Sequence, residues 1–471
     1  MNHESRISLL GMCITGLLLG GVYANDAGPA NGPLRVCMEN PRYFTNGSGK
    51  AIYLVGSHTW NNLKDTGDTP TPAPFDYEAY LDMLVRFNHN FIRLWTWELA
   101  KYSYAENQFR YKTPFPWPRT GSVTALDGSP RFDLNRFDQA YFHRLRSRVV
   151  DAGERGIYVS IMLFEGHGMQ FSLPSWCWDG HPFNRNNNIN GIDGDRNGDG
   201  RGTEIHTLEM PAVTRIQEAY VRKVIDTVND LDNVLFEIAN ESGPSSTDWQ
   251  YHMINYIREY EKDKPKQHSI GMTFQYRGGS NSTLFESPAD WVSPNHEGGY
   301  RNNPPDADGA KVIITDTDHL WGIGGNQSWV WKSFLRGMNP IFMDPYLEAD
   351  KGGWLDPEWD PVRRSMGYTR TFAERIDLVK MKPSSHLSST EYCLANPGEE
   401  YLVYLPEGGM ATLELSAAAG RLDMEWFNPS TGETIGAGTV LGGAKREFVA
   451  PFDGDAVLYV WSGTPNCLST L

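Results

Sequence analysis

The feature of this sequence that most constrains its fold is a regular alternation between short apolar runs and longer amphipathic segments. The apolar runs are nearly continuous, which is typical of strands covered on both faces in a parallel sheet. We predict strands over residues 51–57, 90–96, 157–164, 233–240, 268–275, 291–295, 311–317 and 339–344. The segments between them have helical periodicity and predict helices over 75–87, 136–154, 211–230, 247–262, 328–337 and 359–380.

This order of elements predicts the α/β class, a (β/α)₈ barrel (TIM barrel) whose ring of parallel strands is surrounded by helices. The connections that follow the fifth and sixth predicted strands lack a clear helical pattern. Ahead of the barrel, residues 42–56 form two apolar runs around an Asn-Gly-Ser-Gly turn, which predicts a β-hairpin.

The pattern changes after Pro383, where short apolar runs alternate with turns rich in Gly, Asn and Pro up to residue 463. No long amphipathic segment occurs there, so we predict a small all-β sandwich domain. The predicted organisation is therefore a barrel over residues 25–385 followed by a sandwich over residues 386–471.

Residues 1–24 are predicted to be a signal peptide, with Arg6 ahead of a short apolar stretch and small residues before Asn25. This leader predicts a secreted, periplasmic or cell-surface protein. Cys13 raises a lipoprotein as an alternative, although Met12 is bulky for that processing site. No other apolar stretch in the sequence is long enough to span a bilayer.

The formal net charge of −16 opposes binding to nucleic acid, whose phosphates are negatively charged. The sequence contains 15 Trp and 22 Tyr residues, which suit either sugar stacking or a large core. Four cysteines remain after the leader, and they allow two disulfides in any of three pairings or buried free thiols: Cys37, Cys177, Cys393 and Cys467.

Two carboxylates follow predicted strands, at the end of a barrel where catalytic groups lie. Glu241 follows the fourth strand and Asp316 ends the seventh. Two carboxyl groups that face one cleft can cleave a glycosidic bond, one as the acid and one as the nucleophile. We expect Arg93 to keep Asp316 ionised and Asn240 to donate to a sugar hydroxyl.

These motifs resemble clan A glycoside hydrolases of the cellulase-like type. The similarity rests on "IANE" after the fourth strand, "NFIRLW" with Arg93, and an acidic residue that ends the seventh strand. The segments "YLVYLPEGG" and "FVAPFDGDAVLYV" resemble a collagen-binding-type β domain that is often attached to such barrels. The resemblance covers residues 40–463. It implies a retaining hydrolase with Glu241 as the acid/base and the carboxylate beside Arg93 as the nucleophile.

The sequence departs from the clan at the seventh strand, where the clan usually has Glu. Here "VIITDTDHLWG" carries Asp316 at the matching position, with Asp318 as the alternative nucleophile. Aspartate is one methylene shorter than glutamate, so the backbone must come closer to the sugar. We favour Asp316, and the substitution leaves a non-catalytic carbohydrate-binding barrel as the alternative function.

Other side chains at the predicted strand ends are candidates for substrate binding: His58, Trp97, His296 and His319. Together with His167, the histidines also suit a metal-dependent hydrolase, a less favoured alternative. Trp97, Trp176 and Trp178 are candidate platforms for sugar stacking.

The segment "DGDRNGDGRGTE" at residues 193–204 has the spacing of a calcium-binding loop. Its oxygen ligands would be Asp193, Asp195, Asn197, the Asp199 carbonyl and Glu204. We expect a structural Ca²⁺ that orders the loop, and no cofactor for catalysis. An acidic loop that binds nothing is the alternative.

Overall fold

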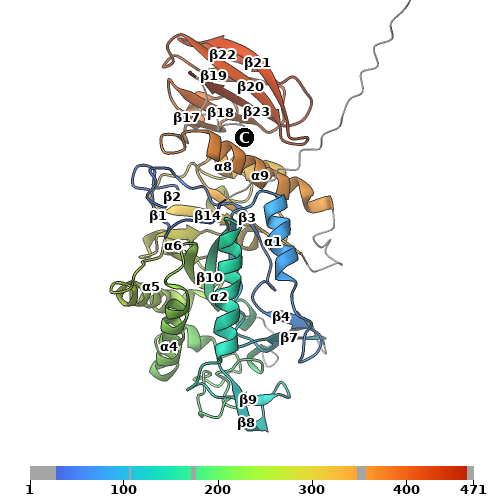
Figure 1. Ribbon diagram of the computed structural model, residues 1–471, viewed down its shortest axis with the longest axis vertical. Coiled ribbons are helices and arrows are strands. Elements are labelled where there is room, and N and C mark those ends of the chain that lie inside the picture. Colours follow the sequence, from blue (N-terminus) through green and yellow to red (C-terminus); the bar gives the residue numbers. More distant parts are fainter. Residues whose placement is uncertain (1–27, 106–107, 171–176, 347–356, 464–471) are drawn as a thin grey trace, which may run out of the picture.

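The computed structural model describes residues 28–105, 108–170, 177–346 and 357–463. The predicted leader, Trp176 and Cys467 lie outside the described residues. A barrel makes up the larger part of the chain, and an all-β sandwich lies at the opposite end of the long axis from the β8–β9 hairpin (Figure 1).

An eight-stranded parallel sheet forms the barrel, in the order β3-β15-β14-β13-β12-β11-β10-β5. The ring closes between its first and last strands, where Asn90 N donates to Val55 O at 3.0 Å. The strands are β3 (Gly56–His58), β5 (Phe91–Leu94), β10 (Tyr158–Glu165), β11 (Val234–Asn240), β12 (Ile270–Thr273), β13 (Trp291–Ser293), β14 (Val312–Asp316) and β15 (Asn339–Met343). The predicted fold class is thereby confirmed.

Helices cover the outside of the barrel (Figure 1). They are α1 (Tyr77–Arg86), α2 (Gln139–Glu154), α4 (Pro211–Val228), α5 (Thr247–Glu261), α6 (Asn281–Glu286), α8 (Gln327–Leu335) and α9 (Asp360–Arg375). The short helix α7 (Thr317–Leu320) directly follows β14. Only the six-residue α6 follows the fifth strand, and the sixth is followed by the 3₁₀ turn η4 (Glu297–Gly299). Helix α9 ends five residues before the predicted position because Ile376 adopts extended backbone with ψ 159°.

The helix starts follow the sequence. The side chains of Asp76, Asp138 and Asn326 accept hydrogen bonds from the first turns of α1, α2 and α8, and Pro211 begins α4. Such caps satisfy backbone N–H groups that have no partner inside the helix.

The chain enters the barrel through the strands β1 (Arg35–Val36) and β2 (Phe44–Thr45). Phe44 and Ile52 exchange backbone hydrogen bonds at 3.3 and 2.7 Å, which is the pairing expected of the predicted hairpin.

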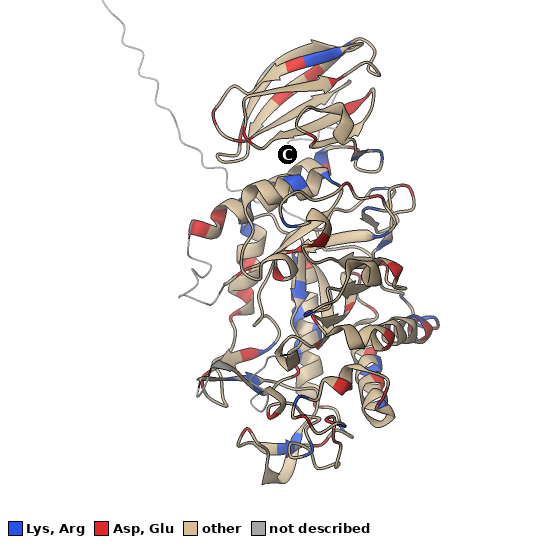
Figure 2. Cartoon of the chain, turned by 180° about the vertical axis from the view of Figure 1, so that it is seen from behind, with Lys and Arg blue, Asp and Glu red and all other residues tan. Residues whose placement is uncertain are grey.

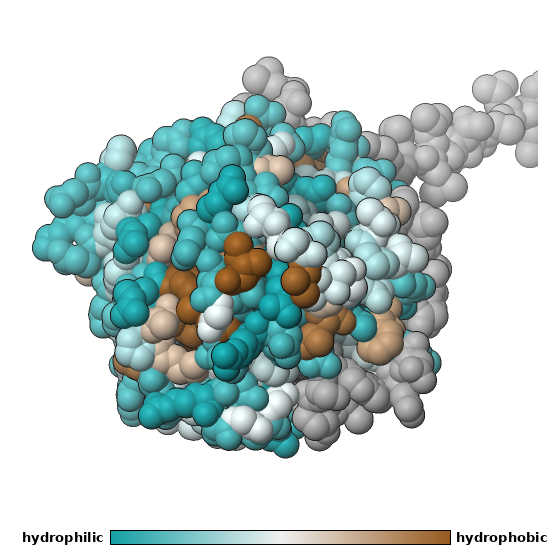
Figure 3. Space-filling model, turned by 90° about the horizontal axis from the view of Figure 1, so that it is seen from below, coloured by the Kyte–Doolittle hydropathy of each residue, from teal (hydrophilic) through white to brown (hydrophobic). Residues whose placement is uncertain are grey.

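The long connections that follow β3 and β5 carry their own strands at the end of the barrel far from the sandwich. These strands are β4 (Asp65–Gly67), β6 (Lys101–Ala105), β7 (Gln108–Thr113), β8 (Arg119–Thr124) and β9 (Pro130–Phe132). We call this end of the barrel the mouth, because the carboxyl ends of the barrel strands point toward it. Viewed from this end, the surface is mainly hydrophilic with scattered apolar side chains (Figure 3).

The C-terminal part consists of a six-stranded sheet, β16-β17-β18-β23-β20-β21, and the pair β19-β22. The strands are β16 (Lys382–Pro383), β17 (Cys393–Asn396), β18 (Glu400–Leu405), β19 (Met410–Glu414), β20 (Arg421–Asn428), β21 (Glu433–Leu441), β22 (Lys445–Val449) and β23 (Ala456–Trp461). Neighbouring strands whose register is resolved are antiparallel.

The sequence of β18 is almost wholly apolar because side chains on both of its faces are buried. Tyr401, Val403 and Leu405 pack inside the sandwich, whereas Leu402 and Tyr404 join the barrel core. Alternate side chains of a strand point to opposite faces, so both faces of β18 are covered. The sandwich therefore packs against α8 and α9 of the barrel as a continuation of the main core.

Acidic residues occur on the barrel and on the sandwich alike (Figure 2). No helix among the described residues is long and apolar enough to cross a membrane. Cys37, Cys177 and Cys393 are buried and free, so none of these three is bonded to another.

Candidate active site

Arg93, on β5, is the centre of a buried network of charged groups at the mouth. Its Nε and Nη2 atoms donate to the two carboxylate oxygens of Glu237 at 2.8 and 2.6 Å. Its Nη1 atom donates to Asp316 at 2.8 Å and to Asp318 at 3.2 Å. One planar guanidinium thus fixes carboxylates from β11 and from the end of β14.

Asp316 is completely buried and its oxygens bind protein donors. It accepts from His58 Nε2 at 3.0 Å, from the backbone N of Asp318 at 2.9 Å and from Arg93. His58 Nε2 carries the proton, because His58 Nδ1 accepts from Trp95 Nε1 at 2.8 Å. Burial alone would raise the pKa of Asp316, but His58 and Arg93 hold it well below its usual range. Asp316 is thus enclosed by protein donors in this structure.

Asp318 lies two residues further on, in α7, and its side chain is 8% exposed. Burial raises its pKa well above the usual range, and the negative charges of Glu241 and Asp316 raise it further. Asp318 is the residue that the sequence analysis names as the alternative nucleophile.

Glu241 follows β11 with a left-handed backbone, φ 51°, which is strained for a residue other than glycine. Its Oε2 atom is 2.5 Å from His167 Nδ1. Burial would lower the pKa of His167, but the Glu241 carboxylate raises it to about 9. The pair therefore retains a proton at neutral pH. The Glu241 carbonyl accepts from Gln170 Nε2 at 2.5 Å, which fixes the strained backbone.

Asn240 presents an oriented amide beside Glu241. Its Oδ1 atom accepts from Arg93 Nη2 at 2.6 Å and is 3.2 Å from His319 Nε2. His319 Nδ1 in turn lies 2.7 Å from Ser293 Oγ, and burial together with Arg93 lowers the pKa of His319 to about 3. The two donors fix the orientation of the amide, and Asn240 Nδ2 is buried without an acceptor among the described residues.

A second cluster of buried polar groups contacts the segment that follows Glu241. Glu98 accepts from the backbone N of Glu165 at 2.9 Å, and its Oε2 is 2.8 Å from His206 Nε2. His206 Nδ1 is 3.1 Å from Ser242 Oγ, so the cluster reaches the residue next to Glu241. Burial raises the pKa of Glu165 to about 7. The sequence analysis missed Glu98, Glu237 and His206. These residues lie far apart in the chain and meet only in the folded structure, so no spacing pattern in the sequence reveals them.

The remaining predicted substrate-binding residues do not join this centre. Trp97 is 4% exposed, and its ring stacks on Tyr102 at a centroid distance of 5.1 Å. Trp178 is buried and stacks on His181 at 5.2 Å. His296 is exposed beside η4 and, among the described residues, makes no contact with the charged network. Partly exposed aromatic side chains at the strand ends are instead Trp60, Phe274, Tyr276 and Trp321.

The predicted calcium loop has its oxygens turned toward its own backbone. Asp195 accepts from the N–H groups of Gly198, Asp199 and Gly200 at 2.9–3.1 Å. Asn197 Oδ1 accepts from Asp199 N, while Asp193 Oδ1 accepts from Asp195 N. Glu204 reaches the same loop, with Oε1 3.3 Å from Asn197 N. In the described part of the chain no three His, Cys, Asp or Glu side chains are close enough to hold one metal ion.

Two family models match parts of the chain. Residues 109–276 match a domain of unknown function (DUF6298), and residues 382–460 match the "putative collagen-binding domain of a collagenase". A search of curated proteins gives no match.

Solved structures share the whole architecture. A glycoside hydrolase family 5 protein from Bacteroides vulgatus has 16% identity and a TM-score of 0.62, with 92% of this chain and 94% of that chain covered. A second structure, titled as a putative glycoside hydrolase from the same organism, has 14% identity and a TM-score of 0.61, with 92% and 82% covered. The structural neighbours of this chain are thus clan A glycoside hydrolases, and at these identities the likeness establishes the shared fold.

Proposed function

We propose that this protein is an exported retaining glycoside hydrolase that cleaves a poly- or oligosaccharide with Glu241 as the acid/base and Asp318 as the nucleophile. The observation that carries the proposal is the oriented Asn240 amide beside Glu241, with a buried N–H that lacks an acceptor among the described residues. A buried N–H without an acceptor costs about 1–3 kcal/mol, which a bound sugar hydroxyl would recover.

In the proposed reaction, Glu241 gives its proton to the glycosidic oxygen while the Asp318 carboxylate attacks the anomeric carbon. The leaving sugar departs with that proton, and an ester joins the remaining sugar to Asp318. Glu241 then removes a proton from water, which attacks the same carbon and releases Asp318.

Burial and the negative charge of Glu241 raise the pKa of Asp318, whereas Arg93 lowers it. His167, whose pKa is about 9, lies 2.5 Å from Glu241 Oε2 and can supply the proton that Glu241 delivers. Arg93 stabilises the Asp318 carboxylate when the proton lies on Glu241. In this scheme Asp316 is the ionised anchor of Arg93 and His58 and does not touch the sugar.

The test compares Glu241→Gln with Asp318→Asn on a panel of aryl glycosides and polysaccharides. We expect Glu241→Gln to lose about 10²–10⁴-fold on unactivated substrates. It should keep much of its activity on a substrate with an activated leaving group, and azide should accelerate it. Asp318→Asn should be inactive on both substrates.

The control is Asp316→Asn. We expect this variant still to form the covalent ester between the sugar and Asp318. If Asp316→Asn abolished the trapped sugar ester while Asp318→Asn kept it, Asp316 would be the nucleophile. If Glu241→Gln hydrolysed every substrate at the wild-type rate, the proposal would be wrong. Glycan binding without turnover by the wild type would favour the non-catalytic alternative.

Export and calcium are further proposals. Export rests on the leader over residues 1–24. Calcium rests on the oxygen donors of Asp195, Asn197 and Asp199 on one loop, to which Glu204 returns.

A further inference from the structure

A cavity of about 210 Å³ lies directly beside the Glu241 backbone. It is formed by the loop after β10, the turn η2 (Thr203–His206), the segment after Glu241 and the end of the loop after β12. The lining includes Gln170, Arg201, Thr203, His206, Ser245 and Arg277. Gln170 connects the cavity to the active site, because its Nε2 atom donates to the Glu241 carbonyl.

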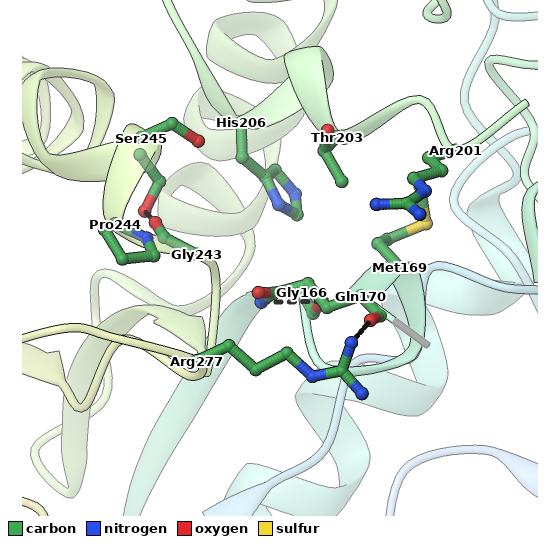
Figure 4. Close-up of a pocket in the computed structure, with 11 residues that line it drawn as sticks. Gly166, Met169, Gln170, Arg201, Thr203, His206, Gly243, Pro244, Ser245 and Arg277 are labelled. Atoms are coloured by element: carbon green, nitrogen blue, oxygen red, sulfur yellow. Dashed lines mark hydrogen bonds between the residues drawn. The ribbon is translucent and has the colours of Figure 1, made fainter. Parts of the chain in front are cut away.

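The charge of this cavity is opposite to that of the whole protein. The sequence has 58 acidic and 42 basic residues, yet the described lining contains two arginines, one histidine and no acidic residue. In Figure 4, Arg201 and the ring of His206 point into the space, and Arg277 runs along its edge to the Gln170 carbonyl. Such a lining attracts an anion into a surface that otherwise repels it.

The backbone turns sharply at both arginines. Arg277 has a left-handed φ of 58°, and its Nη1 atom donates to the Gln170 carbonyl at 2.5 Å. Its guanidinium also lies 5.4 Å from the centre of the Tyr276 ring. Arg201 comes between Gly200 and Gly202, both with positive φ, so the chain turns sharply on either side of it. A strained backbone at a position that aims a guanidinium is typical of a binding site.

The other lining groups match a sugar. Hydroxyl groups come from Thr203 and Ser245, and Gln170 adds an amide. The volume is below the roughly 300–1,000 Å³ of pockets for drug-sized ligands, so one small unit fits. Guanidinium groups pair well with the planar carboxylate of an acid and with sulfate oxygens.

We propose that this cavity is a subsite for an anionic sugar unit, which carries a carboxylate or a sulfate and lies next to the unit that is cleaved. The inference rests on the proposed function for its place in the substrate, although the binding itself needs no turnover. Arg201 and Arg277 bind the acidic group, and the hydroxyl groups of the lining bind the ring.

The test measures binding to the full chain by titration calorimetry at constant ionic strength. The probes are D-glucuronate, D-galacturonate, D-glucose 6-sulfate, D-glucose and acetate. We expect at least one acidic sugar to bind the wild type ten times more tightly than glucose or acetate. Preference for a uronate or for the sulfate ester identifies the acidic group.

The variants are Arg201→Gln, Arg277→Gln and, as the matched control, Arg196→Gln. Arg196 is on the same loop as Arg201, but it pairs with Glu209 at 3.4 Å and does not line the cavity. We expect the first two variants to lose the preference and Arg196→Gln to retain it. No acidic-sugar binding to the wild type would overturn the proposal, as would equal binding of acetate or an equal loss in Arg196→Gln.

The two proposals fail in different ways. Acidic-sugar binding in a protein that hydrolyses no glycan would reject the hydrolase and keep the subsite. Hydrolysis of neutral glycans without acidic-sugar preference would keep the hydrolase and reject the subsite.

Discussion

The mouth of the barrel and the contact between barrel and sandwich bury their side chains for different purposes. At the mouth, Arg93 joins buried carboxylates, the backbone is strained at Glu241, and the Asn240 amide has an unused donor. At the sandwich contact, Trp331 packs on Tyr404, Phe372 and Phe427 at centroid distances of 5.7–6.0 Å. The buried charges and the strained backbone at the mouth lower the stability of the fold, as is typical of functional sites. The aromatic contacts at the sandwich raise its stability through apolar burial.

The largest effect should come from breaking the charged network at the mouth. Arg93→Met leaves Glu237 and Asp316 buried without their cation, which costs about 3–5 kcal/mol of unfolding free energy. Activity should also fall strongly, because Asp318 and Asn240 lose the group that orients them. Urea unfolding and glycosidase assays measure the two losses.

The control is Arg336→Met, near the sandwich, where Arg336 pairs with Asp306 at 2.6 Å. It should lower stability less, because Asp306 is 40% exposed, and leave activity intact. Equal loss of activity in both variants would mean that Arg93 has no special role at the mouth.

A comparable loss of stability without loss of activity should follow from Trp331→Ala. Trp331 is completely buried, and such a truncation costs about 3–5 kcal/mol. Calorimetry should show a lower melting temperature, while the rate measured well below it stays at the wild-type level. Trp331→Phe should cost less, because a ring remains and the Trp331 Nε1 donor has no partner among the described residues. A changed rate in Trp331→Ala would show that the sandwich influences the mouth.

A smaller effect should appear in the pH dependence of stability through Glu165. Burial raises its pKa to about 7, so the folded protein holds a proton that the unfolded chain releases near pH 4.5. Stability from this group is therefore present at low pH and falls as pH rises to about 7, by at most about 1.4 kcal/mol per pH unit. Glu165→Gln should remove this slope in urea unfolding at pH 5, 6 and 7. Identical slopes in both proteins would contradict the assignment.

The smallest expected effect concerns the loop over residues 193–204. If it binds calcium, adding Ca²⁺ after chelation should raise the melting temperature by a few degrees, since binding only to the folded state stabilises it. Asp195→Asn should weaken this response. An unchanged melting temperature at millimolar Ca²⁺ would show that the loop's carboxylates serve only its own N–H groups.

The sequence by itself determined the barrel, because eight nearly continuous apolar runs can be buried on both faces in only a few ways. It also brought Asn240 and Glu241 to the mouth, since residues that follow parallel strands gather at one edge of the sheet. Only the tertiary structure distinguishes the surroundings of Asp316 and Asp318. The two aspartates are two residues apart and chemically identical, and Arg93 contacts both, but His58 and a backbone N–H bind Asp316. The same reason explains Trp97: whether a ring faces a cleft or a neighbouring ring depends on packing between distant segments, which no local pattern records.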